Sequence, residues 1–314
     1  MTRVGAIDCG TNSIRLLIAD IDPHSGRLTD LLRRMEIVRL GYRVDETGVI
    51  APEAMARTLA QAREYAAQCS ELGVERVRFV ATSASRDARN AQDFVDGVRE
   101  AFGAFRVTPD VVTGHQEASL SFRGATGDLR ANGIPGPYLM VDLGGGSTEF
   151  VRGTADVEQA RSVDVGCVRI TERHLRSDPP TGGEIEAAVQ DIDAAIDEAA
   201  EVVGFDGIST LVGLAGSITT ITAHALHLTR YDPDMIHLSQ LPSAQVMDAC
   251  TSLLLMSRAE RSARPFIHKG RVDVIGAGAL VWRTIVDRME RDAGISRVVT
   301  SEHDILDGIA LSIA

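Results

Sequence analysis

The strongest constraint on the fold is a sequence pattern that occurs twice. The first copy is VGAIDCGTNSIRLLIAD near the N-terminus, and the second is YLMVDLGGGSTEFVRG in the middle of the chain. Each copy places an aspartate, Asp8 or Asp142, at the end of an apolar run, followed by a glycine turn, Ser/Thr residues and a second apolar run. Short apolar runs joined by a glycine turn are typical of a β-hairpin. The repeat therefore predicts two homologous halves that each open with a hairpin.

The remaining pattern predicts an alternating α/β protein with two domains. A chain of 314 residues with 44% hydrophobic content exceeds one typical core. The Gly- and Pro-rich stretch 126–137 is expected to be a loop at the boundary. Strand-like runs alternate with helical periodicity, which favours an α/β arrangement.

Local signals mark several further elements. PHSG at 23–26 predicts a turn before a third strand, and Pro52 opens a helix that Gly73 closes. Thr181 and Glu184 form the pattern of a helix-capping box. The sequence also predicts a small-residue turn at 213–217, helices over about 243–263 and 271–292, and a final strand, turn and helix.

Charge and cysteine content narrow the class of ligand and the location. The formal net charge of -12 argues against a general nucleic-acid binder, and Lys269 is the only lysine. A polyanionic ligand would therefore need arginines or a metal ion. The four cysteines form no Cys-x-x-Cys pair, the N-terminus shows no signal peptide, and no apolar run reaches membrane-spanning length. We expect a protein of the reducing cytoplasm.

The glycine turns predict phosphate binding of an unusual kind. A Walker loop needs a lysine that is missing here, and a Rossmann loop is followed by a helix, whereas STEFVRG after Gly146 has the pattern of a strand. Glycine backbone N–H groups and Ser/Thr hydroxyls can hold an anion, and a preceding aspartate would repel it unless a divalent cation lies between. The pattern predicts a metal phosphate held between two hairpins; the alternative is a pair of ordinary tight hairpins.

The candidate ligands follow from that prediction. Mg²⁺, or another divalent cation, is assigned to Asp142 and Glu149, with Asp8 contributing through water. Arg15 could contact phosphate or form a salt bridge on a strand face. The residues of the two hairpins expected to hold phosphate are Asn12, Ser13, Arg15, Gly144, Gly145, Gly146, Ser147 and Thr148.

Five motifs resemble, in order, those of the exopolyphosphatase/guanosine pentaphosphate phosphohydrolase family. They are DCGTNSIRLLIAD, ATSASRDARN, VVTGHQEASLSFRGA, VDLGGGSTEF and LVGLAGSITT. The family is a branch of the actin, Hsp70 and sugar kinase superfamily, so the resemblance implies two ribonuclease-H-like domains flanking a cleft. It implies an N-terminal domain of residues 1–120 plus 299–314, a second domain of 121–298, and a homodimer.

The resemblance also suggests individual roles. Glu117 occupies the position of the family's catalytic glutamate, and Arg86 that of its phosphate-binding arginine. Gly216 and Ser217 match a third loop, which lies near the nucleoside in nucleotide-using relatives, and the resemblance implies that both contact phosphate. Two positions depart from the family pattern: Gln116 stands where a first glutamate is usual, and Leu306-Asp307 replaces Arg-Glu.

The resulting hypothesis is a Mg²⁺-dependent exopolyphosphatase that releases orthophosphate from the end of inorganic polyphosphate. Alternatives are hydrolysis of guanosine pentaphosphate, an ATP-dependent kinase, and a non-enzymatic sensor of polyphosphate or the nucleotide. The roles of two further groups of residues stay open. Arg264, His268, Lys269 and Arg271 could guide polyphosphate or form a solvated junction, and His224 with His227 would need further ligands to bind zinc.

Overall fold

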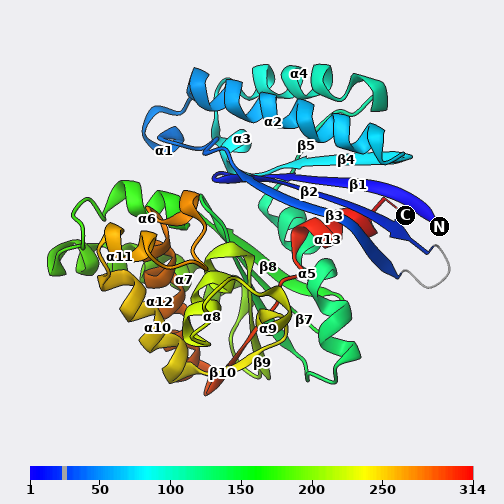
Figure 1. The fold of residues 1–314 in the computed structure, drawn as a ribbon. Helices are drawn as coiled ribbons and strands as arrows, with labels where there is room; N and C mark the ends of the chain where they lie inside the picture. Colours follow the sequence, from blue (N-terminus) through cyan, green and yellow to red (C-terminus); the bar gives the residue numbers. More distant parts are fainter. Residues whose placement is uncertain (23–26, 314) are drawn as a thin grey trace. The chain divides into compact units, whose positions relative to one another are not determined.

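The chain forms two compact units. The computed structural model describes residues 1–22 and 27–313, so the predicted turn at 23–26 lies outside the described residues. Unit 1 comprises Met1–Gly124 and the residues from Ile305 onward, and unit 2 comprises Ala125–Asp304 (Figure 1). The chain returns to unit 1 at Ile305 rather than at 299, because Arg297–Thr300 is a strand of the sheet of unit 2.

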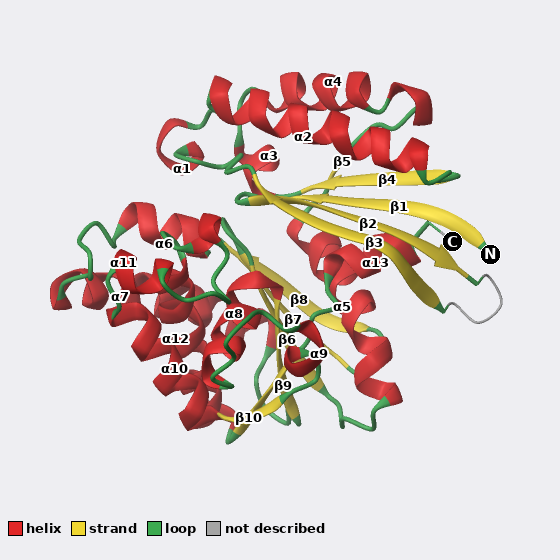
Figure 2. Ribbon diagram, viewed as in Figure 1, coloured by secondary structure: helices red, strands yellow, loops and turns green. Residues whose placement is uncertain are grey.

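The sheet of unit 1 has the strand order β3-β2-β1-β4-β5 among the described residues (Figure 2). β1 pairs antiparallel with β2 and parallel with β4. Alternate residues of β1 enter different cores: Val4 and Ala6 pack on one face, Ile7 and Cys9 on the other. The central strands β1, β2 and β4 are therefore buried on both faces, whereas the edge strands β3 and β5 are more exposed. Its strands are β1 (Thr2–Cys9), β2 (Ser13–Ile21), β3 (Leu28–Ile37), β4 (Arg76–Ala81) and β5 (Asp110–Val111).

Helices cover both faces of this sheet. One face packs against α2 and α4, and the other against α13 and the N-terminal part of α5. α5 carries the chain across the boundary between Gly124 and Ala125. The helices are α1 (Val44–Thr47), α2 (Pro52–Glu71), α3 (Ser83–Asp87), α4 (Ala91–Ala101), the 3₁₀ turn Gly103–Phe105, α5 (Gly114–Ala131) and α13 (Ile305–Leu311).

The sheet of unit 2 repeats this arrangement. Its order is β10-β11-β9-β6-β7-β8, in which the hairpin β6–β7 and the parallel strands β6, β9 and β11 correspond to β1–β2 and to β1, β4 and β5. The additional β10 pairs antiparallel at the edge. The predicted duplication and the α/β class are confirmed. The strands are β6 (Tyr138–Leu143), β7 (Thr148–Gly153), β8 (Val157–Val163), β9 (Thr210–Leu214), β10 (Gln240–Pro242) and β11 (Arg297–Thr300).

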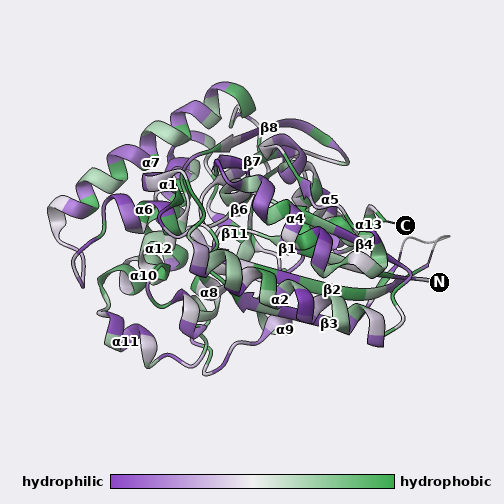
Figure 3. Cartoon of the chain, turned by 90° about the horizontal axis from the view of Figure 1, so that it is seen from above, coloured by the Kyte–Doolittle hydropathy of each residue, from purple (hydrophilic) through white to green (hydrophobic). Residues whose placement is uncertain are grey.

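The helices of unit 2 bury one large core. Leu139, Val141 and Phe150 of the sheet share it with the apolar sides of α7 and α12, and polar and apolar residues alternate along α7 (Figure 3). The predicted capping box of Thr181 and Glu184 is confirmed at the start of α7. The helices are α6 (Cys167–Arg173), α7 (Gly182–Val203), α8 (Ala215–Ala225), α9 (Pro233–Ile236), α10 (Ser243–Leu255), α11 (Arg258–Ser262), the 3₁₀ turn Lys269–Arg271 and α12 (Ile275–Ala293).

Several expected boundaries were wrong. The expected loop at 126–137 begins with helix, since α5 continues to Ala131. The helix expected over 243–263 is broken after Leu255, because Ser257 starts a new helix with its own capping box to Glu260. β9 passes directly into α8 without a turn at 213–217.

The helices were also compared with the requirements for crossing a membrane. Among the helices formed by the described residues, none combines sufficient length and apolar content to span a bilayer.

Candidate active site

The two hairpins turn in the same way. In unit 1 the N–H of Gly10 donates to the carbonyl of Ser13 at 2.9 Å, and in unit 2 the N–H of Gly144 donates to the carbonyl of Ser147 at 3.0 Å. The carbonyl of Asn12 accepts hydrogen bonds from the N–H groups of Val38 and Arg39 at 3.0 and 2.9 Å. Residues 10–13 and 144–147 are thus equivalent turns at the ends of equivalent strands.

Asp8 and Arg15 face each other across the first hairpin. They are directly opposite in the β1–β2 register, and Nε and Nη2 of Arg15 donate to Oδ2 of Asp8 at 2.9 and 2.7 Å. Asp8 is 5% exposed. The salt bridge considered for Arg15 is therefore present, and a guanidinium neutralises the carboxylate expected to contribute to the metal.

Glu117 contacts Arg86 within unit 1. Glu117 lies in the first turn of α5 and is 8% exposed. Nη1 of Arg86 lies 3.5 Å from Oε2 of Glu117 and donates to the carbonyl of Val112 at 3.1 Å. The arginine is fixed to the strand end and reaches the carboxylate. α3, which carries Arg86, is joined to the first hairpin turn by the 2.8 Å hydrogen bond between Thr11 and Ser83 hydroxyls.

Gln116 has a structural task. Its Oε1 accepts hydrogen bonds from the backbone N–H of Thr113 at 2.9 Å and from the Thr113 hydroxyl at 3.2 Å, while the N–H of Gln116 donates to Oγ1 of Thr113 at 3.3 Å. This reciprocal pair is a capping box, in which Gln and Glu serve equally. The side chain at position 116 is bound to the helix start beside Glu117.

The glycine turn of unit 2 is held from one side by α6. The carbonyl of Gly144 accepts from the N–H of Cys167 at 3.0 Å, and that of Gly145 accepts from Val168 at 2.9 Å. Gly166 permits this approach, since a Cβ there would lie 2.4 Å from the Gly145 carbonyl oxygen. The carbonyl groups of Gly144 and Gly145 are thus held by α6, and the N–H of Gly144 is held by the Ser147 carbonyl across the turn.

Asp142 and Glu149 are cross-strand neighbours in unit 2. They are directly opposite in the β6–β7 register and are 5% and 1% exposed. The hydroxyl of Ser162, on β8, donates to Oε1 of Glu149 at 2.7 Å. Two carboxylates in this position repel each other and need compensating donors or a cation. Their oxygen chemistry fits a hard divalent cation.

Ser147 and Thr148 are both buried, at 2% and 1% exposure. The Thr148 hydroxyl donates to the carbonyl of Val165 at 2.6 Å. This side chain connects the hairpin to the segment before α6, and Thr148 itself lies in β7, paired with Leu143 on one side and Val163 on the other.

Gly216 and Ser217 lie in the first turn of α8, directly after β9. A Cβ at Gly216 would lie 1.9 Å from Nη2 of Arg271, so the guanidinium rests against the glycine. The preceding Ala215 has φ of 69°, a strained value for a residue with a Cβ. Sequence reasoning grouped Arg271 with three other basic residues, whereas the structure assigns it to this loop. A glycine at position 216 indicates that another group comes close to the backbone there, but the sequence does not indicate that this group is Arg271.

Cys167 also lies in this region of unit 2. It is buried at the start of α6, and burial raises the pKa of its thiol, an effect that a hydrogen bond with Ser217 opposes. All four cysteines are buried and free of disulfides.

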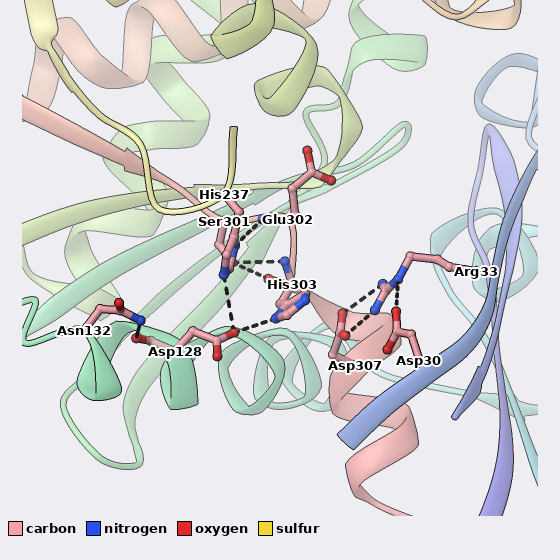
Figure 4. Close-up of polar contacts among 9 residues, drawn as sticks. All are labelled: Asp30, Arg33, Asp128, Asn132, His237, Ser301, Glu302, His303 and Asp307. Carbon is pink, nitrogen blue, oxygen red and sulfur yellow. Dashed lines mark hydrogen bonds and ion pairs between the residues drawn. The ribbon is translucent and has the colours of Figure 1, made fainter. Parts of the chain in front are cut away.

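The remaining candidates occupy other positions. His224 is hydrogen-bonded to Ser252 at 3.0 Å and stacks on Phe266, while His227 is exposed. Asp307, at the departure from the family pattern, pairs with Arg33 of β3, with Nη2–Oδ1 at 2.5 Å (Figure 4). It fixes α13 to the sheet of unit 1.

The fold and the site residues point to a phosphatase family. A model of the Ppx/GppA phosphatase family matches residues 17–313. The chain belongs to this family. It is 48% identical to exopolyphosphatase 2 of Mycobacterium tuberculosis, in an alignment covering 100% of this chain and 99% of that protein.

The solved structures that the chain resembles support the same family. The chain resembles an exopolyphosphatase-like protein with a TM-score of 0.94 and 42% identity, covering 100% of this chain and 98% of the other. It resembles the Aquifex aeolicus PPX-GPPA enzyme with a TM-score of 0.80 and 31% identity, covering 99% of each chain.

Proposed function

We propose that the chain is an exopolyphosphatase, a hydrolase that releases orthophosphate from the end of inorganic polyphosphate by direct attack of water. The 48% identity to an exopolyphosphatase over the full length supports the substrate. The structural observation that carries the mechanism is the contact of Arg86 with Glu117.

Glu117 is the group proposed to orient or deprotonate the attacking water. A carboxylate that is 8% exposed, at the start of a helix, can hold one water in place. Arg86, anchored by the Val112 carbonyl, fixes the position of that carboxylate and presents its remaining N–H groups to a phosphoryl oxygen. Neither role requires the missing P-loop lysine.

In unit 2, the backbone N–H groups of Gly145, Gly146 and Ser147 are proposed to hold phosphate oxygens. The guanidinium of Arg271 adds positive charge beside Gly216 and Ser217. A phosphoanhydride hydrolase needs charge neutralisation on the transferred phosphoryl group more than it needs covalent chemistry. Backbone amides and arginine together provide such neutralisation in a chain of net charge -12.

We propose Mg²⁺ as the metal, held by Asp142 and Glu149. Both are buried carboxylates on adjacent strands, and Ser162 orients Glu149. When bound, the ion would offset negative charge on the substrate phosphates. Asp8 is a weaker candidate because Arg15 already occupies its Oδ2.

Gln116 argues against the sensor alternative. That alternative depended on the loss of a carboxylate from the site, but the side chain caps α5. Guanosine pentaphosphate hydrolysis remains the second candidate, since the chain is 27% identical, over 86% of its length, to a protein named guanosine-5'-triphosphate,3'-diphosphate pyrophosphatase from Photobacterium profundum. A cytoplasmic location and a homodimer complete the proposal, the former in keeping with four free cysteines.

One assay tests the proposed function. Purified protein with Mg²⁺ is incubated in parallel with polyphosphates of defined length, guanosine pentaphosphate and ATP, and released phosphate is measured. We expect release from polyphosphate and a loss of about 100-fold or more in Glu117→Ala. Release from guanosine pentaphosphate alone would favour the second candidate. No release from any of the three would contradict enzymatic function, and release that survives Glu117→Ala would remove the role given to Glu117.

A further inference from the structure

Two histidines converge on one carboxylate in unit 2. Nδ1 of His303 lies 2.5 Å from Oδ2 of Asp128, and Nε2 of His237 lies 3.6 Å from the same oxygen (Figure 4). The two imidazole centroids are 4.6 Å apart. One ligand atom from each residue lies within 4.8 Å of the others.

From this geometry we propose that Asp128, His237 and His303 form a binding site for a divalent transition metal such as Zn²⁺ or Co²⁺. Two imidazoles and a carboxylate suit these ions, whereas Mg²⁺ prefers oxygen ligands only. In a tetrahedral zinc site, neighbouring ligand atoms are roughly 3.3 Å apart, given metal–ligand distances of about 2.0–2.1 Å. The 3.6 Å separation already fits, and the 2.5 Å separation must widen by less than about 1 Å. As the metal takes the place of the proton between His303 and Asp128, that proton moves from Nδ1 to Nε2 of the neutral His303 ring.

The surroundings hold the three ligands in place. The His303 backbone N–H donates to the Ser301 hydroxyl at 3.1 Å, and that hydroxyl donates to the His303 carbonyl at 2.8 Å. All three residues are partly buried, so water can fill the fourth position.

To bind a metal through Nε2, the His237 ring must first move its proton to the other ring nitrogen. Its Nδ1 accepts a 3.2 Å hydrogen bond from the N–H of Glu302, so the neutral ring carries its proton on Nε2. Coordination through Nε2 moves the proton to Nδ1 and breaks that bond. One long hydrogen bond is weak beside a metal–imidazole bond, so the exchange favours the metal. The Glu302 carboxylate accepts from Tyr231 at 2.6 Å and extends away from the three ligands (Figure 4).

The position gives the site a structural consequence. Asp128 follows the crossing of the chain from unit 1 to unit 2, and His303 precedes the return at Ile305. A metal would join these two segments to α9, which ends at Ile236 just before His237. Because the ligands come from distant parts of the chain, binding should stabilise the folded state.

The test uses the full chain, stripped of metals and kept in excess Mg²⁺ to fill oxygen sites. Co²⁺ is titrated while its visible absorption is recorded, and Zn²⁺ is then added. We expect one Co²⁺ per chain, displacement by Zn²⁺, and a rise in Tm with either ion. His303→Gln and Asp128→Asn should each weaken Co²⁺ binding by more than about 100-fold, since they remove a ligand.

His174→Gln is the matched control, because His174 pairs with Asp191 at 2.9 Å in the same unit and should not contribute. Binding that is unchanged in both ligand variants, or lost equally in His174→Gln, would overturn the proposal, as would the absence of any one-to-one binding. If one ligand variant fails to fold by circular dichroism, the other decides.

Discussion

The Oε1 atom of Gln116 accepts a 2.9 Å hydrogen bond from the backbone N–H of Thr113, which caps the helix that carries Glu117. A glutamate at position 116 could make the same bond. We therefore expect Gln116→Glu to leave kcat for polyphosphate within about twofold of wild type, whereas Gln116→Ala loses about 1 kcal/mol of stability. Steady-state kinetics and urea unfolding measure the two effects. A large gain of activity in Gln116→Glu would show that a carboxylate at 116 acts in the chemistry.

Asp142→Asn should shift the Mg²⁺ dependence of activity. It keeps the side chain's size but removes one of two facing carboxylates, so we expect the half-maximal Mg²⁺ concentration to rise at least about tenfold. Asp8→Asn is the comparison, and it should move the Mg²⁺ curve less because Asp8 pairs with Arg15. Identical Mg²⁺ titrations for Asp142→Asn and wild type would contradict the metal assignment.

Gly216→Ala should act through Arg271. The added Cβ would lie 1.9 Å from Nη2 of Arg271 and displace the guanidinium. We expect Gly216→Ala and Arg271→Ala each to raise KM for polyphosphate about tenfold, the equivalent of one charge-assisted hydrogen bond. The double variant should be little worse than either single variant. Gly183→Ala, where a Cβ meets nothing within 4 Å, is the control. If the effects of Gly216→Ala and Arg271→Ala on KM are additive in the double variant, the two residues act independently and the prediction is contradicted.

Asp307→Asn should destabilise unit 1. Asp307 is 3% exposed and pairs with Arg33, whose side chain is 33% exposed. We expect a loss of roughly 2 kcal/mol, between the values for buried and for surface pairs. Asp30→Asn removes the more exposed partner of the same arginine and should cost less than about 1 kcal/mol. Equal losses of unfolding free energy for Asp307→Asn and Asp30→Asn in chemical denaturation would mean that the burial of Asp307 does not strengthen its pair with Arg33.

Glu184 predicts an acid-dependent loss of stability. Hydrogen bonds from the Thr181 backbone lower the pKa of Glu184 to about 2, below its ordinary value of 4.5. A lowered pKa means that the stabilisation is complete above 4.5 and is lost as pH falls toward 2. The Tm difference between wild type and Glu184→Gln should therefore be constant from pH 7 to about 5 and shrink below that. A Tm difference that stays unchanged as pH falls from 5 toward 2 would refute the assignment.

Sequence patterns predicted the duplicated α/β fold because both hairpins carry their signals locally. The aspartate, the glycine turn and the apolar runs are adjacent in sequence, as are Thr181 and Glu184 of the α7 cap. The end of α5 was missed because Gly127 and Asn132 suggest a loop, whereas packing of Leu129, fully buried, keeps the segment helical.

Contacts between distant residues could not be predicted in this way. Arg271 reaches Gly216 only through the packing of unit 2. His237 and His303 meet Asp128 from three separate segments, and neither histidine lies in a recognisable ligand spacing. The roles of the predicted site residues stay predictions, since the structure gives their positions and not their chemistry.

The two hairpins share one turn but differ at the position opposite their aspartate. Arg15 faces Asp8, and Glu149 faces Asp142. If ionised, one pair sums to zero and the other to minus two. The duplicated halves thus differ in charge at this cross-strand position: one copy holds an ion pair of opposite charges, and the other holds an acidic pair, which is the charge that the proposed Mg²⁺ site would require.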